Sequence, residues 1–179
     1  MNLKNDMLLY HGSYCAVSKP DLSLCSEGRD FGRGFYLTSD KKQAIQFIGN
    51  SIRKHKIKES TGFVSTYQIV DLDNLNIFSF HKPDAEWLTV ISAYRGLGDC
   101  DIIMHYQDYD VMAGKIANDK TNQTILAYIG GIYGKVGSMR AIRIAISILE
   151  PNNLVDQVCF RTERALQAIR FIKAEEYTI

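Results

Sequence analysis

The pattern of apolar and polar residues along this chain predicts several short strands. Alternation is clearest where Phe63, Tyr67 and Ile69 share one side of a strand, opposite Thr66 and Gln68. The other candidates are short apolar runs bounded by polar or turn residues, which is typical of strands with a buried face. The expected strands are residues 7–11, 63–70, 76–80, 101–104, 109–113, 155–160 and 168–174.

Helical spacing of apolar residues separates these strands. A Ser-Asp pair at 39–40 can cap a helix over 41–52, with Ala44, Phe47 and Ile48 on one face. Further helices are expected after Pro83, around 125–132 and 139–149, with a helical turn from 162. Strands mixed with helices of varied length, without regular βαβ alternation, indicate an α+β fold. No repeat or linker divides the chain, so residues 1–179 are expected to form a single domain.

Composition narrows the class of protein. The 179 residues are 46% hydrophobic and 23% charged, as in an ordinary globular domain. The 21 basic and 20 acidic residues leave a net charge of +1, so no overall attraction to nucleic acid or anionic membrane is expected. The chain has no apolar run that could span a bilayer, and its first six residues do not resemble a signal peptide. We therefore expect a cytoplasmic protein without a membrane partner, although delivery by a leaderless route would leave no mark.

The four cysteines do not indicate a metal site. Cys15, Cys25, Cys100 and Cys159 form no CxxC pair and no cysteine–histidine cluster with ligand spacing, so we predict no metal. Cys159 lies in an apolar strand and is expected to be a buried free thiol. A disulfide between Cys15 and Cys25 is the less favoured alternative for a cytoplasmic protein.

Two nearby segments carry the chemistry that this sequence can support. Residues 10–13 read Tyr-His-Gly-Ser at the end of an apolar strand. Residues 30–38 read Asp-Phe-Gly-Arg-Gly-Phe-Tyr-Leu-Thr and lead into a helix. A glycine permits close main-chain approach to a ligand, and an aromatic ring can stack on a flat one. This combination predicts a pocket for a flat ligand that carries an amide.

The order of these residues resembles the NAD pocket of diphtheria-toxin-like ADP-ribosyltransferases and poly(ADP-ribose) polymerases. Residues 32–36 closely resemble the polymerases' Gly-Lys-Gly-Ile-Tyr. The resemblance implies a split β-sheet core with flanking helices, and NAD as the substrate. It implies that the Gly12 main chain binds the carboxamide, His11 a ribose, and Tyr36 the nicotinamide ring, with Phe47 as a second aromatic wall. Arg29 and Arg33 suit the pyrophosphate, because a guanidinium matches phosphate geometry. The expected NAD-binding residues are His11, Gly12, Ser13, Arg29, Arg33, Gly34, Tyr36 and Phe47.

The chain departs from this pattern at the family's catalytic glutamate. Aligned on the apolar strand at 155–160, Gln157 takes the glutamate position. An amide oxygen can accept a hydrogen bond from a ribose hydroxyl, but it lacks the full negative charge that would stabilise an oxocarbenium ion. Some bacterial toxins carry a glutamate two positions later, where this chain has Cys159. Asp156, Glu163 or a carboxylate elsewhere in the chain are the candidates for supplying the charge.

A small uncharacterised bacterial family assigned to the ADP-ribosyltransferase superfamily resembles the chain more closely, from Leu8 to Ile172. The resemblance depends on His11, Tyr36 and the strand that carries Gln157. It implies a toxin-like or effector-like mono-ADP-ribosyltransferase with His11, Tyr36 and Gln157 as catalytic residues. The acceptor would be a protein or a nucleic acid, and a neutralising antitoxin is a candidate partner. Two alternatives stay open: a catalytically degenerate module that binds NAD or ADP-ribose, and an NAD glycohydrolase.

Overall fold

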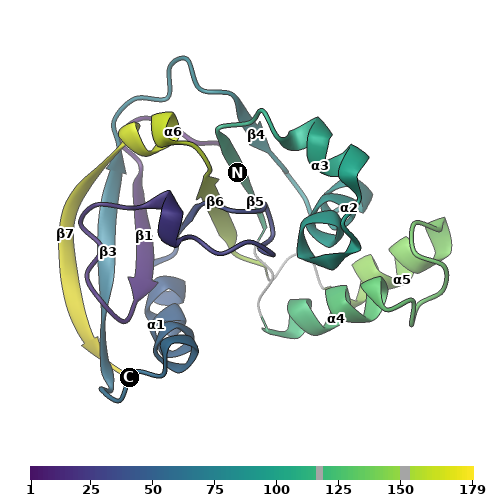
Figure 1. Cartoon of the computed structure of the whole chain (residues 1–179), viewed down its shortest axis with the longest axis horizontal. Coiled ribbons are helices and arrows are strands. Elements are labelled where there is room, and N and C mark those ends of the chain that lie inside the picture. Colours follow the sequence, from purple (N-terminus) through teal and green to yellow (C-terminus); the bar gives the residue numbers. More distant parts are fainter. Residues whose placement is uncertain (116–118, 150–153) are drawn as a thin grey trace.

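A computed structural model describes residues 1–115, 119–149 and 154–179. Within these ranges the chain folds as an α+β protein around one seven-stranded sheet, with the strand order β4-β5-β6-β2-β1-β3-β7 (Figure 1). All neighbouring strands are antiparallel except the parallel pair β4 and β5. The strands are β1 Leu8–Ser13, β2 Phe35–Thr38, β3 Thr61–Ile69, β4 Ile77–Ser79, β5 Val111–Lys115, β6 Asp156–Phe160 and β7 Ile169–Thr178.

Polar side chains cap most of the helices at their first turns. Asp40 accepts from the Lys42 N–H at the start of α1, and Asp84 and Thr162 cap α2 and α6 in the same way. A π-helical turn, Ala93–Leu97, follows α2, and a 3-10 turn, Leu22–Leu24, lies in the loop between β1 and β2. The helices are α1 Lys41–His55, α2 Ala85–Ser92, α3 Cys100–Tyr106, α4 Asp119–Ile129, α5 Met139–Ile148 and α6 Glu163–Gln167.

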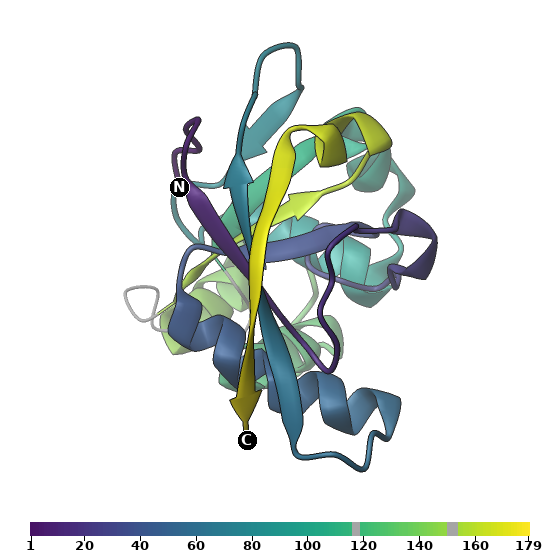
Figure 2. The same cartoon turned by 90° about the vertical axis from the view of Figure 1, so that its left-hand side faces the viewer.

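Helices cover different parts of the sheet. Figure 1 shows α1 below β1, and α2 to α5 gathered beside the β4-β5 edge. In Figure 2 the long strand β7 crosses the front of the molecule beside its partner β3. A cluster around Trp87, Phe31 and Met112 joins α2, α4 and α5 to β5 and β6. A second cluster, around Leu9 and Tyr67, fills the other side of the strands, under α6 and the β1–β2 loop.

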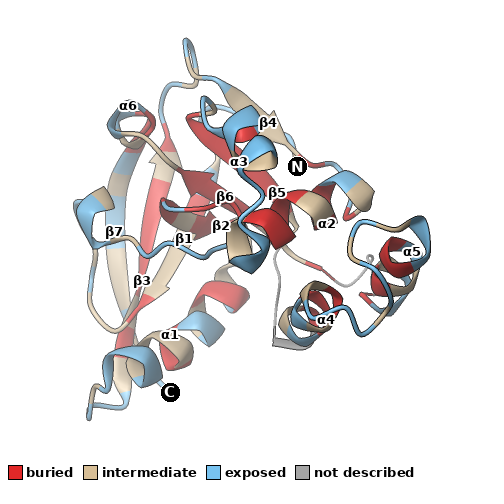
Figure 3. Ribbon diagram, turned by 45° about the vertical axis from the view of Figure 1, so that its right-hand side comes forward, coloured by how far each residue is buried: buried red, intermediate tan, exposed pale blue. Residues whose placement is uncertain are grey.

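Burial follows these layers. The strands in the middle of the sheet are largely buried, and most helices carry buried residues on one side and exposed residues on the other (Figure 3). Residues on both faces of β6, including Val158 and Cys159, are fully buried. The middle of the sheet is therefore a rigid platform, which is the preferred place for a binding site that must hold its geometry.

The predicted elements largely match the observed ones, with two corrections. Residues 101–104 were expected to form a strand, but they lie in helix α3, because Asp99 caps that helix by accepting from the Ile102 N–H. The helix expected around 125–132 ends at Ile129, because Gly130 and Gly131 follow and Gly131 has a φ of 74°; Ile132 lies beyond the helix and is 75% exposed. Of the three residues expected on one face of α1, Ala44 and Ile48 are fully buried and Phe47 is 36% exposed. The α+β class is confirmed.

Candidate functional site

Three segments that are far apart in the sequence lie on adjacent strands. The sheet places β6, β2 and β1 side by side, and these strands carry Gln157, Tyr36 and His11. Thr38 lies opposite Gln157, and Tyr36 lies opposite Cys159. Since side chains alternate between faces along a strand, Tyr36 and Gln157 point to the same face of the sheet. The candidate site is built on this face.

His11 joins β1 to β2 through its side chain. Its Nδ1 lies 2.8 Å from the Tyr36 carbonyl, and its ring lies 4.6 Å from that of Phe35. A carbonyl only accepts, so Nδ1 is the donor, and Nε2 of the neutral ring is left as an acceptor. Burial lowers the pKa of His11, although the Tyr36 hydrogen bond opposes this shift, and the neutral form is favoured. Strand alternation places this ring on the opposite face from the Tyr36 ring.

The main chain of Gly12 faces the place where β1 and β2 separate. The Ile69 N–H donates to the Met7 carbonyl at 2.9 Å. Hydrogen-bonded pairs alternate along an antiparallel ladder, so the odd-numbered residues of β1 direct their peptide groups toward β3, as Met7 does. The even-numbered residues, Gly12 among them, direct theirs toward β2. The β1–β2 ladder has one register pair in the described chain, Tyr10↔Thr38.

The side chain of His11 contacts β2 just beyond the end of this ladder. In a continued ladder, Tyr36 would lie opposite Gly12 and its carbonyl would accept from the Gly12 N–H. That carbonyl accepts from Nδ1 of His11. The peptide groups of Gly12 point toward β2 beyond the last register pair. A Cβ at Gly12 would lie 1.7 Å from the Ala44 carbonyl oxygen of α1, so helix packing also requires a glycine here.

Tyr36 is held by its hydroxyl group. The hydroxyl donates to the Gly32 carbonyl at 2.7 Å and accepts from the Phe31 N–H at 2.9 Å. Burial raises the pKa of Tyr36 well above 10, and the nearby Cys159 and Asp30 raise it further. The phenol is thus neutral at any physiological pH. It fixes the end of the β1–β2 loop onto the sheet.

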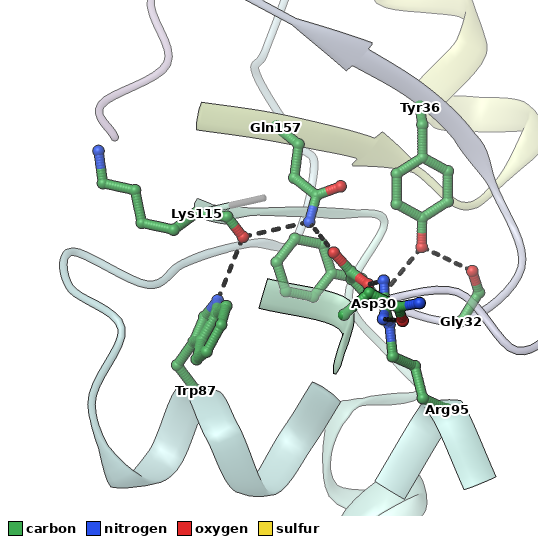
Figure 4. A network of polar contacts seen from close by, with 9 residues as sticks. Asp30, Gly32, Tyr36, Trp87, Arg95, Lys115 and Gln157 are labelled. Atoms are coloured by element: carbon green, nitrogen blue, oxygen red, sulfur yellow. Dashed lines mark hydrogen bonds and ion pairs between the residues drawn. The ribbon is translucent and has the colours of Figure 1, made fainter. Parts of the chain in front are cut away.

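Gln157 lies in a network of polar contacts for which the sequence has no local signal (Figure 4). Its Nε2 donates to Oδ2 of Asp30 at 2.5 Å and to the Lys115 carbonyl at 3.2 Å. Gln157 and Asp30 are 4% and 3% exposed. The Trp87 indole N–H donates to the same Lys115 carbonyl at 3.3 Å. A carboxylate from the β1–β2 loop therefore contacts the residue at the expected glutamate position.

Arg95 holds the other side of this carboxylate. Its guanidinium forms an ion pair with Oδ1 of Asp30 at 2.5 Å, and it also donates to Asn122 on α4. The side chains of Asp30 and Arg95 are 4% and 15% exposed. Asp30 directly precedes the Phe-Gly motif at 31–32, but the sequence has no signal that pairs it with Arg95. The network joins the loop, the turn after α2, and β6.

The remaining predicted NAD-binding residues are spread around this centre. Ser13 ends β1, with its Oγ 3.4 Å from Oγ of Ser51 on α1. Gly34 packs on β6, where a Cβ would lie 2.4 Å from Sγ of Cys159. Arg33 is exposed and donates from Nε to the Leu22 carbonyl at 2.9 Å. Arg29 is exposed and lies near Lys54. The pKa of the Lys54 amine is lowered mainly by burial and further by the positive charge of Arg29. These arginines do not contact the Gln157 network in the described structure.

The described ranges were also compared with what a metal ion or a membrane-spanning helix would require. No group of three or more histidine, cysteine or acidic residues is arranged to hold a metal ion there. Nor does that part of the chain contain a helix of the length and hydropathy needed to cross a bilayer. All four cysteines are free thiols, and Cys159 is buried as predicted.

Comparison with known proteins identifies a family but not an activity. Residues 7–171 match the family described as Protein of unknown function (DUF3990). No curated protein and no solved structure matches the chain. Because the family match extends over most of the 179 residues, the chain belongs to the DUF3990 family.

Proposed function

We propose that this protein is an NAD-dependent mono-ADP-ribosyltransferase of the toxin or effector type. It would act in the cytoplasm on a protein or nucleic-acid acceptor, and an antitoxin would be its natural regulator. The observation that carries the proposal is the adjacency of β6, β2 and β1, which places Gln157, Tyr36 and the His11-Gly12 pair on neighbouring strands. Those are the segments that the resemblance to ADP-ribosyltransferases requires to meet.

The main-chain geometry at Gly12 supports binding of the nicotinamide amide. A carboxamide has both a donor and an acceptor, and the N–H and C=O of one strand residue can bind both. The peptide groups of Gly12 point toward β2 beyond the Tyr10↔Thr38 pair. The ring of Tyr36, anchored by its hydroxyl, provides a fixed aromatic surface beside this position. A pyridine ring held by its amide could stack there.

The acceptor atoms of the site suit the ribose groups of NAD. Neutral His11 presents Nε2 as an acceptor on the opposite face of the sheet from Gln157, and the resemblance assigns it the adenosine-side ribose and not the ribose that reacts. The Gln157 amide oxygen is a second acceptor, on the face that Tyr36 shares. In the reaction, the bond between ribose C1′ and the nicotinamide nitrogen breaks and its electron pair leaves with nicotinamide. The acceptor then bonds to C1′ and loses a proton. Electron-rich oxygen atoms near C1′, such as the Gln157 amide oxygen, stabilise the positive charge that develops on the ribose.

One observation favours a second candidate, a module that binds NAD without turnover. Gln157 carries no charge, and Asp30 contacts its amide from a loop that Tyr36 fastens to the sheet. A site without a catalytic charge could hold NAD or ADP-ribose as a sensor. A glycohydrolase would differ from both in releasing nicotinamide without any acceptor.

The proposal is tested with NAD that carries a label on its adenylate half. Purified protein is incubated with and without cell lysate, and both nicotinamide release and labelled acceptor are measured. We expect acceptor labelling that is lost in Tyr36→Ala and Gln157→Met, and retained in the control Gln68→Met on β3. NAD binding without release would instead establish the binding module. Equal release with and without lysate, and no labelled acceptor, would establish a glycohydrolase. Absence of NAD binding would refute all three functions.

A further inference from the structure

Two acceptors determine which way the Gln157 amide points. The Asp30 carboxylate and the Lys115 carbonyl both lie at the Nε2 end, at 2.5 and 3.2 Å. The reversed amide would place its oxygen against two other acceptors, and burial would make that repulsion costly. The nitrogen must therefore face Asp30 and Lys115, and the oxygen must face the other way (Figure 4).

The oxygen end of this amide is open. No described residue donates a hydrogen bond to Oε1 of Gln157. The fully buried side-chain atoms without a hydrogen-bond partner in the described chain are Thr66 Oγ1, Ser92 Oγ and Arg161 Nε, and Oε1 of Gln157 is not among them. It therefore reaches solvent although Gln157 as a whole is only 4% exposed. An oriented acceptor that reaches solvent from an otherwise buried side chain is suited to receive a hydrogen bond from a ligand.

Asp30 is itself rigidly held. Its carboxylate forms the ion pair with Arg95, and the next two residues are bound through their main chain by the Tyr36 hydroxyl. A group held from several sides loses little entropy when it orients another group. The negative charge also strengthens the hydrogen bond from Nε2, because a charged acceptor binds more strongly than a neutral one.

We propose that Asp30 is a positioning residue that fixes the Gln157 amide, so that Oε1 accepts a hydrogen bond from a ribose hydroxyl of NAD. This inference rests on the proposed function. Through this contact the carboxylate polarises the amide and increases electron density on Oε1. ADP-ribosyltransferases place this charge directly on a glutamate. In this protein the charge is one hydrogen bond away, on Asp30 of the β1–β2 loop.

The other candidate carboxylates do not contact Gln157. Asp156 precedes it on β6 and pairs with the Lys115 ammonium group at 3.1 Å. Glu163 is an exposed residue in the first turn of α6. Asp156→Asn is therefore a matched control for Asp30→Asn, because it removes a neighbouring charge and leaves the amide contact intact.

The arrangement makes a counter-intuitive prediction about Gln157→Glu. If glutamine marked a decayed site, restoring the glutamate would raise activity. Next to Asp30 and the Lys115 carbonyl, however, a second carboxylate is repelled and will tend to take up a proton. We expect Gln157→Glu to lower nicotinamide release on the order of a hundredfold. The double variant Asp30→Asn/Gln157→Glu exchanges donor and acceptor, and should recover about tenfold of that loss.

Two readouts test the proposal. The first is the side-chain amide NMR signal of Gln157, assigned by its loss in Gln157→Glu. Asp30→Asn should shift this signal, and Asp156→Asn should not. The second is nicotinamide release from NAD together with the NAD dissociation constant. Asp30→Asn should lower kcat roughly tenfold, the difference between a charged and a neutral hydrogen bond, while the dissociation constant changes less than about threefold. Unfolding midpoints establish that each variant is folded.

Three results would overturn the proposal. An unshifted Gln157 signal in Asp30→Asn would show that the contact does not exist. A shifted signal with unchanged kcat would show that the contact is only structural. A Gln157→Glu variant more active than the wild type would show that the glutamate is tolerated. If the wild type does not bind NAD, the proposed function and the ligand assignment fail together, while the NMR signal still decides whether Asp30 orients the amide.

Discussion

Replacing Arg95 by methionine tests the polar network at the centre of the site. The variant keeps much of the side-chain length but removes the guanidinium that pairs with Asp30 at 2.5 Å. Both side chains are largely buried, at 15% and 4% exposure. Removing one partner of a buried ion pair costs about 3–5 kcal/mol, because the remaining charge stays in a medium that solvates it poorly. That loss is a large part of the roughly 5–15 kcal/mol by which a domain is stable.

A control with the same chemistry and greater exposure is available in the same region. Lys115 pairs with Asp156 at 3.1 Å, with 26% and 27% of the two side chains exposed. Lys115→Met keeps the main-chain carbonyl that Gln157 and Trp87 bind, and should cost at most about 1 kcal/mol. The expected difference between the two variants is thus about 2–4 kcal/mol.

Urea unfolding followed by fluorescence measures this difference. Trp87, the chain's single tryptophan, is fully buried beside the network, so its emission reports unfolding. The double variant Asp30→Asn/Arg95→Met should recover part of the loss, because it removes the buried charge as well. Equal losses of unfolding free energy in Arg95→Met and Lys115→Met would refute the idea that burial gives the Asp30 pair its importance.

Further predictions concern packing, protonation and thiol reactivity. Gly12→Ala would place a Cβ 1.7 Å from the Ala44 carbonyl oxygen. We expect the unfolding free energy measured in urea to fall by about 1–3 kcal/mol or more, and NAD binding to be lost. An unchanged unfolding midpoint would argue against this packing. Burial lowers the pKa of His11 below 6.5, so the unfolded chain binds more protons than the folded one just below that pH. Unfolding free energy should therefore fall as pH drops from 6.5 toward the folded pKa, and His11→Gln should flatten this part of the curve; identical curves would contradict the shift. Burial raises the pKa of the Cys159 thiol to about 12. A thiol reagent should therefore label exposed Cys100 in the folded protein, and Cys159 only after unfolding. Rapid labelling of Cys159 would show that it is accessible.

Local signals predicted most of the secondary structure. Asp40 and the helical spacing after it predicted α1, and the apolar run before Thr162 predicted the order β6, α6, β7. The run Ile102-Ile103-Met104 was ambiguous, because three successive apolar residues fit a strand or a helix. The N-cap at Asp99 favours the helix. Phe47 lies at the edge of the apolar stripe of α1, where periodicity alone does not decide burial.

The candidate site could be predicted only in part, because its contacts are non-local. Propensity and periodicity describe one element at a time, whereas the meeting of Tyr36 and Gln157 depends on β6 pairing with β2. That juxtaposition came from the resemblance to ADP-ribosyltransferases and not from the pattern of residues. The contact between Asp30 and Gln157 spans 127 positions and has no local signature. A sequence can show that a glutamate is replaced, but not that a loop carboxylate contacts its replacement.

An NAD titration followed by NMR asks whether NAD binds where β1, β2 and β6 meet. We expect saturable shifts of the main-chain amide signals of Gly12 and Tyr36 and of the side-chain amide of Gln157. Signals from the edge strand β7, which β3 separates from β1, should not move. Saturable binding with shifts confined to other parts of the molecule, or no binding at millimolar NAD, would show that these three strands do not form an NAD site.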